Sequence, residues 1–362
     1  GLACLGLAML AGCAEPVRPG PPELTAAQAR ALVGEWLPPQ VPDRGDWAAD
    51  IQQAFSSIGI VPTPEYVCAV AAVAEQESGY QINPVIPGLP AIARKEIDAR
   101  AERAGVPTLV VHAALLLDSP DGRSYNARID AARTERDLSD IYEDLVGVVP
   151  LGKLFLADHN PIRTAGPMQV SVSYAEGYVD RHPYPYPVRT TLRREVFTRR
   201  GSVYFGTAHL LDYPAGYDRM LYRFADYNAG QYASRNAAFQ HALSVASGAP
   251  LATDGELVRL DGGGPPTSTE LVARSLGRRL DLSESDIHGD LEHSRREDFV
   301  RTELYQKVYE LAERSLGQPL SHERVPQIEL KGPKITRHLT TAWYAERVDG
   351  RYQRCMARVQ GQ

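Results

Sequence analysis

The sequence of 362 residues lacks any uninterrupted apolar run of about 18 residues, the length that a helix needs to cross a bilayer. It has only four cysteines, too few for a small fold stabilised mainly by disulfides. It also lacks a basic excess: 45 acidic against 39 basic residues argue against a nucleic-acid-binding protein. With 43% hydrophobic and 23% charged residues, the composition is that of a globular chain with a buried core.

Several catalytic signatures are missing as well. The sequence contains no HExxH pair, no GxSxG elbow, no P-loop and no GxGxxG after a strand. Its nine histidines are scattered without the spacing of metal ligands. We therefore expect neither a metal nor another cofactor.

The N-terminal residues indicate a targeting signal rather than a folded element. Residues 1–12 are uncharged and mostly apolar, which is typical of the hydrophobic part of a secretory signal. The following Leu10-Ala11-Gly12-Cys13 resembles a bacterial lipoprotein box, which implies a lipid anchor, palmitate included, on Cys13. Ala14 after it implies sorting to the Gram-negative outer membrane, facing the periplasm. The alternative is a chance cysteine in an apolar leader. Residues 13–45 then form a Pro-rich tether.

Apolar periodicity and turn residues predict a mainly α protein. We expect helices over residues 26–36, 46–58, 64–78, 89–104, 125–146, 195–211, 218–227, 233–247, 268–279 and 296–316. The run Gly262 to Pro266 indicates a linker. Asp349-Gly350 is compatible with a small β-hairpin or a helix-to-loop junction, and we favour the hairpin.

Glu77 stands out on the predicted helix 64–78. At 100° per residue it falls within about 40° of Tyr66, Val70 and Val73, so a carboxyl group ends an apolar stripe. Partial desolvation would raise its pKa, as a general acid near neutral pH requires. The alternative is a frayed helix end with Glu77 turned to water.

Four motifs in order resemble the soluble lytic transglycosylases, which have a lysozyme-like fold. They are Glu77-Ser78-Gly79-Tyr80, Gly166-Pro167-Met168-Gln169, Gly206-Thr207-Ala208-His209-Leu210 and Asp226-Tyr227-Asn228-Ala229-Gly230. The resemblance implies that Glu77 is the single catalytic carboxylate, that Tyr227 hydrogen-bonds near it, and that Ser78, Met168, Gln169 and Asn228 contribute to substrate binding. Pro167 and Asp226 depart from the family, which has Leu and Ala there. The whole chain also resembles a family of uncharacterised bacterial lipoproteins in the lysozyme-like superfamily.

The resemblance implies a domain plan and a reaction. A lysozyme-like domain would span residues 46–250 with an insertion at 81–162, and residues 251–362 would form a mostly helical accessory region. The substrate would be the peptidoglycan glycan strand, cleaved between N-acetylmuramic acid and N-acetylglucosamine with a 1,6-anhydro product. Two alternatives stay open: a muramidase using the same Glu77, and a non-catalytic periplasmic scaffold. The insertion or the accessory region could bind a protein partner.

Two further features concern cysteine and arginine. Cys68 and Cys355 would be the cysteines left beyond Cys13 in an oxidising compartment, so we predict a disulfide between them, with two unrelated buried thiols as the alternative. Cys68 lies opposite Glu77 on the helix, so the bridge should not touch the groove. The arginines between 189 and 200 are interpreted as a solvated face, with peptidoglycan carboxylates as the alternative ligand.

Overall fold

The computed structural model describes residues 24–148, 160–259, 264–330 and 338–361. In this part of the chain seventeen α-helices dominate, and the strands form only two antiparallel pairs. The mainly α prediction is therefore confirmed. None of the described helices is long and apolar enough to cross a membrane. The predicted signal segment and Cys13 lie outside the described residues.

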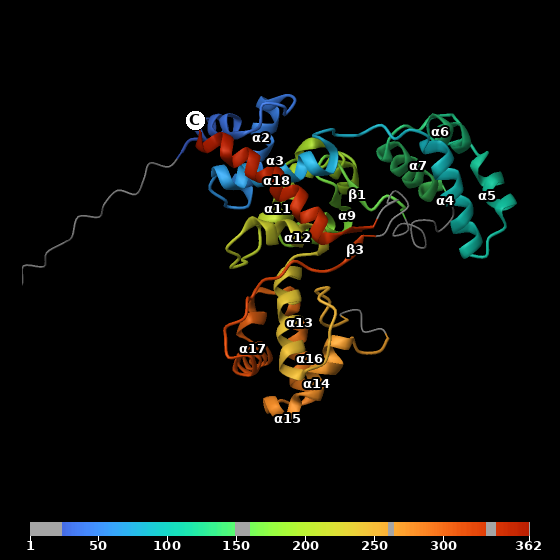
Figure 1. Ribbon diagram of the computed structural model, residues 1–362. Helices are drawn as coiled ribbons and strands as arrows, with labels where there is room; N and C mark the ends of the chain where they lie inside the picture. Colours follow the sequence, from blue (N-terminus) through green and yellow to red (C-terminus); the bar gives the residue numbers. More distant parts are fainter. Residues whose placement is uncertain (1–23, 149–159, 260–263, 331–337, 362) are drawn as a thin grey trace, which may run out of the picture.

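Most of the buried side chains belong to a central body (Figure 1). Its core is built by helices from both ends of the chain and from the middle, together with the strand pair β1–β2. These elements are α1 (Ala26–Trp36), α2 (Arg44–Ser57), α3 (Pro64–Ser78), β1 (Thr164–Ala165), β2 (Val170–Ser171), α9 (Val172–Val179), α10 (Leu192–Val196), α11 (Arg199–Leu211), α12 (Met220–Ala229) and α18 (Thr341–Gln360).

Helix α3 runs through the centre of this body, and its sequence explains both of its ends. The Thr63 hydroxyl accepts from the Tyr66 amide at 3.3 Å, and Pro64 occupies the first turn, where its missing N–H costs nothing. Gly79 ends the helix in the left-handed conformation with φ 59°. The predicted bounds of this helix are confirmed, and residues 67–74 are all buried.

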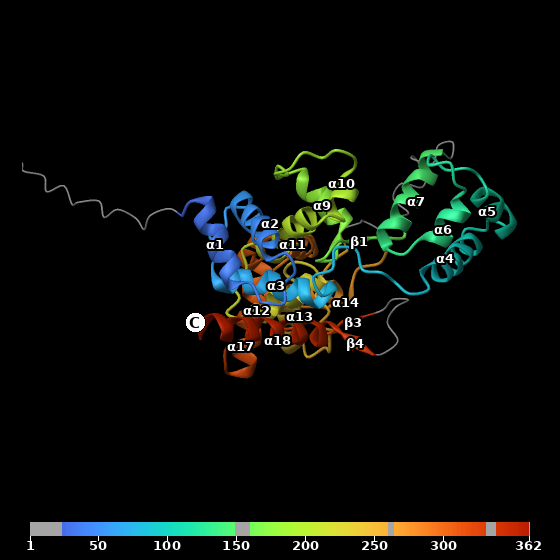
Figure 2. The ribbon, with the colours of Figure 1, turned by 90° about the horizontal axis from the view of Figure 1, so that it is seen from above.

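The C-terminal helix α18 returns to the body and packs against α3 and α12 (Figure 2). A disulfide joins Cys355 of α18 to Cys68 of α3, with 5.6 Å between the Cα atoms, as predicted. Arg351 adds an ion pair to Glu75 of α3 at 3.5 Å. The predicted hairpin at Asp349-Gly350 is wrong, because α18 continues through both residues. Its buried stripe of Tyr344, Val348, Tyr352 and Cys355 follows the helical period.

The segment predicted as an insertion forms a separate helical lobe at the right of Figure 1. It has its own small core, which includes Leu89, Leu115, Tyr125, Ile129 and Ile141. Its helices are α4 (Leu89–Arg103), α5 (Thr108–Leu115), α6 (Tyr125–Ala131) and α7 (Glu135–Val148). The single helix predicted over 125–146 is divided, because the Asp137 carboxylate accepts from the amides of Arg133 and Thr134 at 2.9 Å and starts α7 anew.

A third core belongs to the C-terminal lobe, for which α13 (Ala233–Ser247) forms the spine in Figure 1. Phe239 of α13 packs with Phe299 and Tyr305 there. The other elements are α14 (Ser268–Ser275), α15 (Gly277–Leu280), α16 (Glu284–Glu292), the 3₁₀ segments His293–Arg295 and Glu297–Arg301, and α17 (Glu303–Leu316). The helix predicted over 296–316 is shorter than expected, because the Thr302 hydroxyl caps a new start.

The second strand pair connects this lobe to α18. Strand β3 (Glu329–Leu330) pairs antiparallel with β4 (Leu339–Thr340), so a small hairpin does exist near the C-terminus, earlier than predicted. Thr340 then caps α18 by accepting from the Trp343 amide at 3.2 Å. Residues 251–362, predicted as one accessory region, thus contribute to two cores.

Candidate active site

Glu77 lies on the last turn of α3, where the C-terminal helix meets it. Its carboxylate Oε1 accepts a hydrogen bond from the Tyr344 hydroxyl of α18 at 2.5 Å. Val73 and Val70, one and two turns earlier, are fully buried, whereas Glu77 keeps partial solvent access. The predicted stripe therefore exists, and it ends in a half-buried carboxyl group.

Burial raises the pKa of Glu77 to about 7, from an ordinary value of 4.5. The hydrogen bond from Tyr344 acts in the opposite direction, because it stabilises the ionised form. Among the described residues, no charged side chain contributes to this shift. Near neutral pH the group is therefore divided between its acid and its carboxylate forms.

Tyr227 lies beside this pair but makes a different contact from the one expected. Its hydroxyl donates to the main-chain oxygen of Met168 at 2.7 Å. Burial, and after it the charge of Glu77, raises the pKa of Tyr227 well above its ordinary value. Tyr227 and Glu77 are thus neighbours, but the tyrosine that hydrogen-bonds Glu77 is Tyr344.

The loop 166–169 is fastened to α3 directly after Glu77. The Ser78 hydroxyl donates to the Pro167 carbonyl at 2.8 Å. Gln169, with φ 48°, turns the chain, and its side-chain amide contacts the Thr164 hydroxyl at 2.9 Å. Ser78 therefore connects the two motifs, and Gln169 holds the hairpin β1–β2.

Met168 supports this loop from beneath. Its side chain is fully buried, so it reaches the site only through its main chain. It fills the space that a side chain at position 206 would need, since a Cβ on Gly206 would lie 2.6 Å from the Met168 sulfur. The second and third motifs are therefore coupled by packing.

The fourth motif has an exposed and a buried polar residue beside Tyr227. Asn228 is exposed, and its side-chain oxygen accepts from the Thr341 hydroxyl at 2.8 Å. Asp226 is fully buried, and its carboxylate accepts from the hydroxyls of Tyr213 and Tyr217 and from the amides of Tyr232 and Ser234 rather than contacting Glu77. Asp226, which stands where the lytic transglycosylases have Ala, thus stabilises the turn that follows α12.

The comparison with known proteins adds a family. A family model described as "Protein of unknown function (DUF1615)" matches residues 40–358. The chain belongs to the DUF1615 family. The protein of Escherichia coli (strain K12) named "Uncharacterized protein YaiW" is 49% identical over 359 residues, which are 98% of this chain and 97% of that protein. No solved structure matches. Neither description assigns a transglycosylase, so the activity of this DUF1615 protein has to be argued from its site.

The residue that the sequence interpretation missed in this DUF1615 protein is Tyr344. It lies 267 positions after Glu77, outside the four motifs and inside a segment that was assigned to the accessory region. Burial, followed by the charge of Glu77, raises the pKa of Tyr344 well above its ordinary value, so its hydroxyl stays a donor. The only sequence feature that could have drawn attention to Tyr344 is the helical apolar stripe of residues 344–356. That stripe predicts that Tyr344 is buried but does not identify Glu77 as its partner.

Three of the arginines between 189 and 200, one in α10 and two at the start of α11, contact carboxylates of the chain itself. Arg194 pairs with Asp140 of the insertion lobe at 3.0 Å, Arg199 with Asp50 at 2.7 Å, and Arg200 with Glu195 at 2.8 Å. They are therefore ion-paired rather than a purely solvated face. A hollow of about 1110 Å³ lies between α7 and the body, and Glu77 is not among its lining residues.

Proposed function

We propose that this DUF1615 protein is a peptidoglycan lytic transglycosylase with a lysozyme-like catalytic body and Glu77 as its single catalytic carboxylate. The observation that carries the proposal is the state of Glu77: a half-buried carboxyl group with a pKa of about 7, hydrogen-bonded by one tyrosine and beside another. The contacts that bring the four family motifs together around it support the same assignment.

The chemistry requires one group that first gives and then takes a proton. Protonated Glu77 would donate to the oxygen of the bond between N-acetylmuramic acid and N-acetylglucosamine, and the C1–O bond would break. The 2-acetamido oxygen of the substrate would stabilise the positive charge at C1. Ionised Glu77 would then accept the proton of the 6-hydroxyl as O6 bonds to C1 and closes the 1,6-anhydro ring. No water is consumed, and Glu77 ends protonated as it began.

Tyr344 would act as a positioning residue in this cycle. By donating to Oε1 it fixes the plane of the carboxyl group and leaves Oε2 for the glycosidic oxygen. Because its hydrogen bond favours the ionised form, it would help Glu77 after the first proton transfer.

Among the described residues, no second carboxylate acts on Glu77, which favours ring closure over hydrolysis. A glycoside hydrolase usually places a second acidic group at the reaction centre. Among the described residues, no carboxylate contributes to the pKa of Glu77, and the acidic residue of the fourth motif, Asp226, is occupied by four donors. The 6-hydroxyl, already attached to the sugar, has a high effective concentration.

We also propose that the protein faces the periplasm from the outer membrane, anchored by lipid on Cys13. The disulfide Cys68–Cys355 supports a location outside the reducing cytosol. Such an anchor would bring the body close to the glycan strands, although residues 26–41 of the predicted tether pack into the body as α1 and the turn after it.

The decisive experiment is mass spectrometry of the soluble products that the purified protein releases from purified sacculi. We expect muropeptides that end in 1,6-anhydromuramic acid and resist reduction by borohydride. Glu77→Gln should abolish their release. Glu75→Gln makes the same chemical change on the same helix, where Glu75 pairs with Arg351, and should keep most of the activity.

The other outcomes separate the alternatives. Reducible muramic acid ends would identify a muramidase, in which water replaces the 6-hydroxyl. The absence of any soluble product from a protein that still binds sacculi would indicate a scaffold and would refute the enzymatic proposal.

A further inference from the structure

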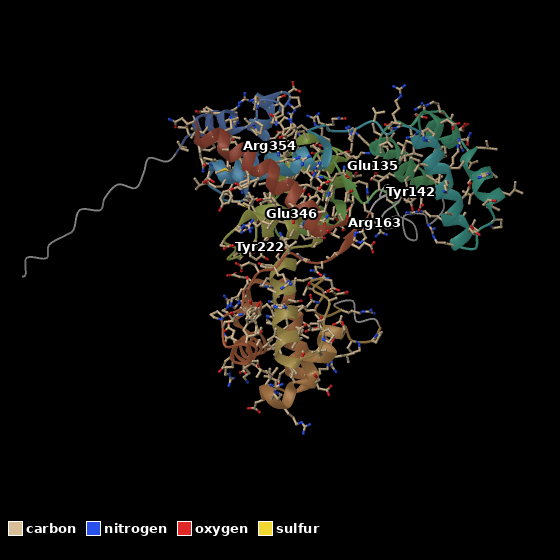
Figure 3. All side chains as sticks on the ribbon, viewed as in Figure 1. Glu135, Tyr142, Arg163, Tyr222, Glu346 and Arg354 are labelled. Atoms are coloured by element: carbon tan, nitrogen blue, oxygen red, sulfur yellow. A yellow bond between two sulfur atoms is a disulfide. The ribbon has the colours of Figure 1, made fainter. Side chains whose placement is uncertain are left out.

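A hollow of about 1110 Å³ separates the insertion lobe from the body. One wall is helix α7, with Tyr142 and Val146. The other wall is the base of the β1–β2 hairpin with α9 and α10, including Arg163, Val172 and Leu192. Figure 3 shows Tyr142 and Arg163 in the region where the lobe approaches the body. The volume exceeds the upper end of the roughly 300–1,000 Å³ typical of small-molecule sites, so the hollow has room for a segment of a polymer.

Several charged groups of the hollow are already neutralised across it. Arg194 of α10 contacts Asp140, Glu143 and Asp144 of α7 at 3.0, 3.2 and 3.8 Å. Arg193 donates to the Ile162 carbonyl at 2.7 Å. These contacts hold the lobe against the body and leave little charge for a ligand.

Two charged residues on the body wall lack an ion-pair partner in the part of the chain that the structure describes. Among the described residues, neither exposed Arg163 nor exposed Glu176 has an ion-pair partner, although both line the hollow. The Arg163 carbonyl accepts from the Val172 amide at 2.9 Å, so Arg163 lies opposite Val172. Glu176 follows Val172 by one helical turn and lies on the same face of α9. A cation and an anion are thus held near each other without forming a pair.

This pair of unneutralised charges fits a ligand that carries both signs. From these contacts we infer that the hollow binds a short peptide with a free carboxylate and a free amino group, with Arg163 holding the carboxylate and Glu176 the ammonium group. The peptide stem of Gram-negative peptidoglycan has this chemistry. The assignment rests on the proposed function, because that function makes the stem part of the substrate.

The position of the hollow relative to Glu77 agrees with a stem attached to a bound glycan strand. One β-hairpin reaches both places: its tip at Pro167 accepts from Ser78, next to Glu77, and its base at Arg163 lines the hollow. Four residues separate Pro167 from Arg163, at most about 13 Å of extended chain. A stem of three or four residues spans about the same length. The sugar would lie at Glu77 while its peptide extends along the hairpin.

The test is calorimetry of the full chain with a soluble stem tripeptide that ends in diaminopimelate. The wild-type protein should bind it, and Arg163→Ala and Glu176→Gln should each weaken binding at least tenfold, because each leaves one ligand charge without its partner. Arg189→Ala removes an exposed arginine that does not line the hollow and should bind like the wild type. No binding by the wild type, or equal affinity of all four proteins, would refute the peptide site.

A second arm distinguishes this inference from the proposed function. Glu77→Gln should bind the tripeptide as the wild type does, since Glu77 does not line the hollow. If sacculi are cleaved but the tripeptide fails to bind, the peptide site is wrong and the enzyme assignment stands. If the tripeptide binds in an Arg163-dependent way but no soluble product appears, the peptide site stands and the enzyme assignment is wrong.

Discussion

At the scale of single residues, the position and the raised pKa of Glu77 could be predicted because the evidence for them is local. The stripe of Tyr66, Val70 and Val73 depends only on helical geometry, and the structure places Glu77 at its end with a raised pKa. Tyr344 could not be predicted in the same way, because its contact joins positions 267 residues apart. Nothing in the sequence around either residue records that pairing.

Tyr344→Phe provides a direct test of this contact. The change removes the donor that stabilises ionised Glu77, so the pKa of Glu77 should rise above about 7. The alkaline limb of the rate–pH profile, where the acid form is lost, should then move to higher pH. The maximal rate should fall about tenfold or more, since a hydrogen bond to a charged group contributes about 1.5–3 kcal/mol. The measurement is product release from sacculi between pH 5 and 9.

Tyr352→Phe is the matched control. It removes a hydroxyl from the same helix, where the Tyr352 ring packs on Phe224 far from Glu77. Its profile should coincide with that of the wild type. A Tyr344→Phe profile with the wild-type limb, or an equal shift in both variants, would show that Tyr344 does not act on Glu77.

At the scale of elements, capping residues predicted helix ends well where the caps were local. Thr63 and Gly79 set α3 as expected. The helix starts that Thr302 and Asp137 cap were not predicted, because the apolar periodicity continues across them. At Asp349-Gly350 the error was the reverse: a turn was predicted where the helix continues. A glycine inside a helix costs about 1 kcal/mol, and the packing of α18 on α3 and α12 outweighs that cost.

Helices α3 and α18 are joined at both ends of their contact, by the disulfide at one end and by the hydrogen bond from Tyr344 to Glu77 at the other. Nine residues separate Cys68 from Glu77 and eleven separate Tyr344 from Cys355, about 13 and 16 Å along the two axes. The disulfide therefore holds one end of an antiparallel pair whose other end holds Glu77. The bridge itself lies about 13 Å from Glu77 along α3, as expected, but α18 is long enough to reach from the bridge to Glu77, which it contacts through Tyr344.

Loss of the disulfide should consequently lower both stability and activity. The bridge closes a sequence separation of 287 residues, for which chain entropy predicts on the order of 5 kcal/mol as an upper value. Thermal melts with and without reductant should differ by several degrees, and turnover should fall as α18 loosens. The double variant Cys68→Ala/Cys355→Ala should melt like the reduced wild type, and its melting temperature should not change when reductant is added. Equal melting of oxidised and reduced wild type would contradict the prediction.

At the scale of the whole molecule, composition and periodicity predicted a mainly α protein. They did not predict which segments of the chain contribute to which core. An insertion was expected at residues 81–162, and the described residues there contain a core of their own. The division of residues 251–362 between two cores was not expected, because it depends on α18 returning to α3 after the lobe. The central body is therefore complete only when α18 has folded onto it.

A molecule that keeps the Glu77 carboxyl group half-buried should lose some stability by it. Below pH 4.5, Glu77 is protonated in both the folded and the unfolded chain. Between pH 4.5 and about 7 the unfolded chain ionises while the folded chain keeps its proton, so the free energy of unfolding falls as the pH rises. Above about 7 both forms are ionised, and the accumulated loss stays constant at up to about 3 kcal/mol.

Glu77→Gln should reveal this loss, because glutamine does not ionise. Relative to wild type, the variant should gain stability between pH 4 and pH 8, up to about 3 kcal/mol, measured as the difference between the two melting curves at each pH. Buried Asp226, whose pKa burial raises to about 6, titrates in both proteins and cancels in the comparison. A difference that stays constant from pH 4 to pH 8 would mean that the pKa of Glu77 is ordinary. In that case Glu77 would be a carboxylate throughout the physiological range, without the proton that cleavage of the glycosidic bond requires.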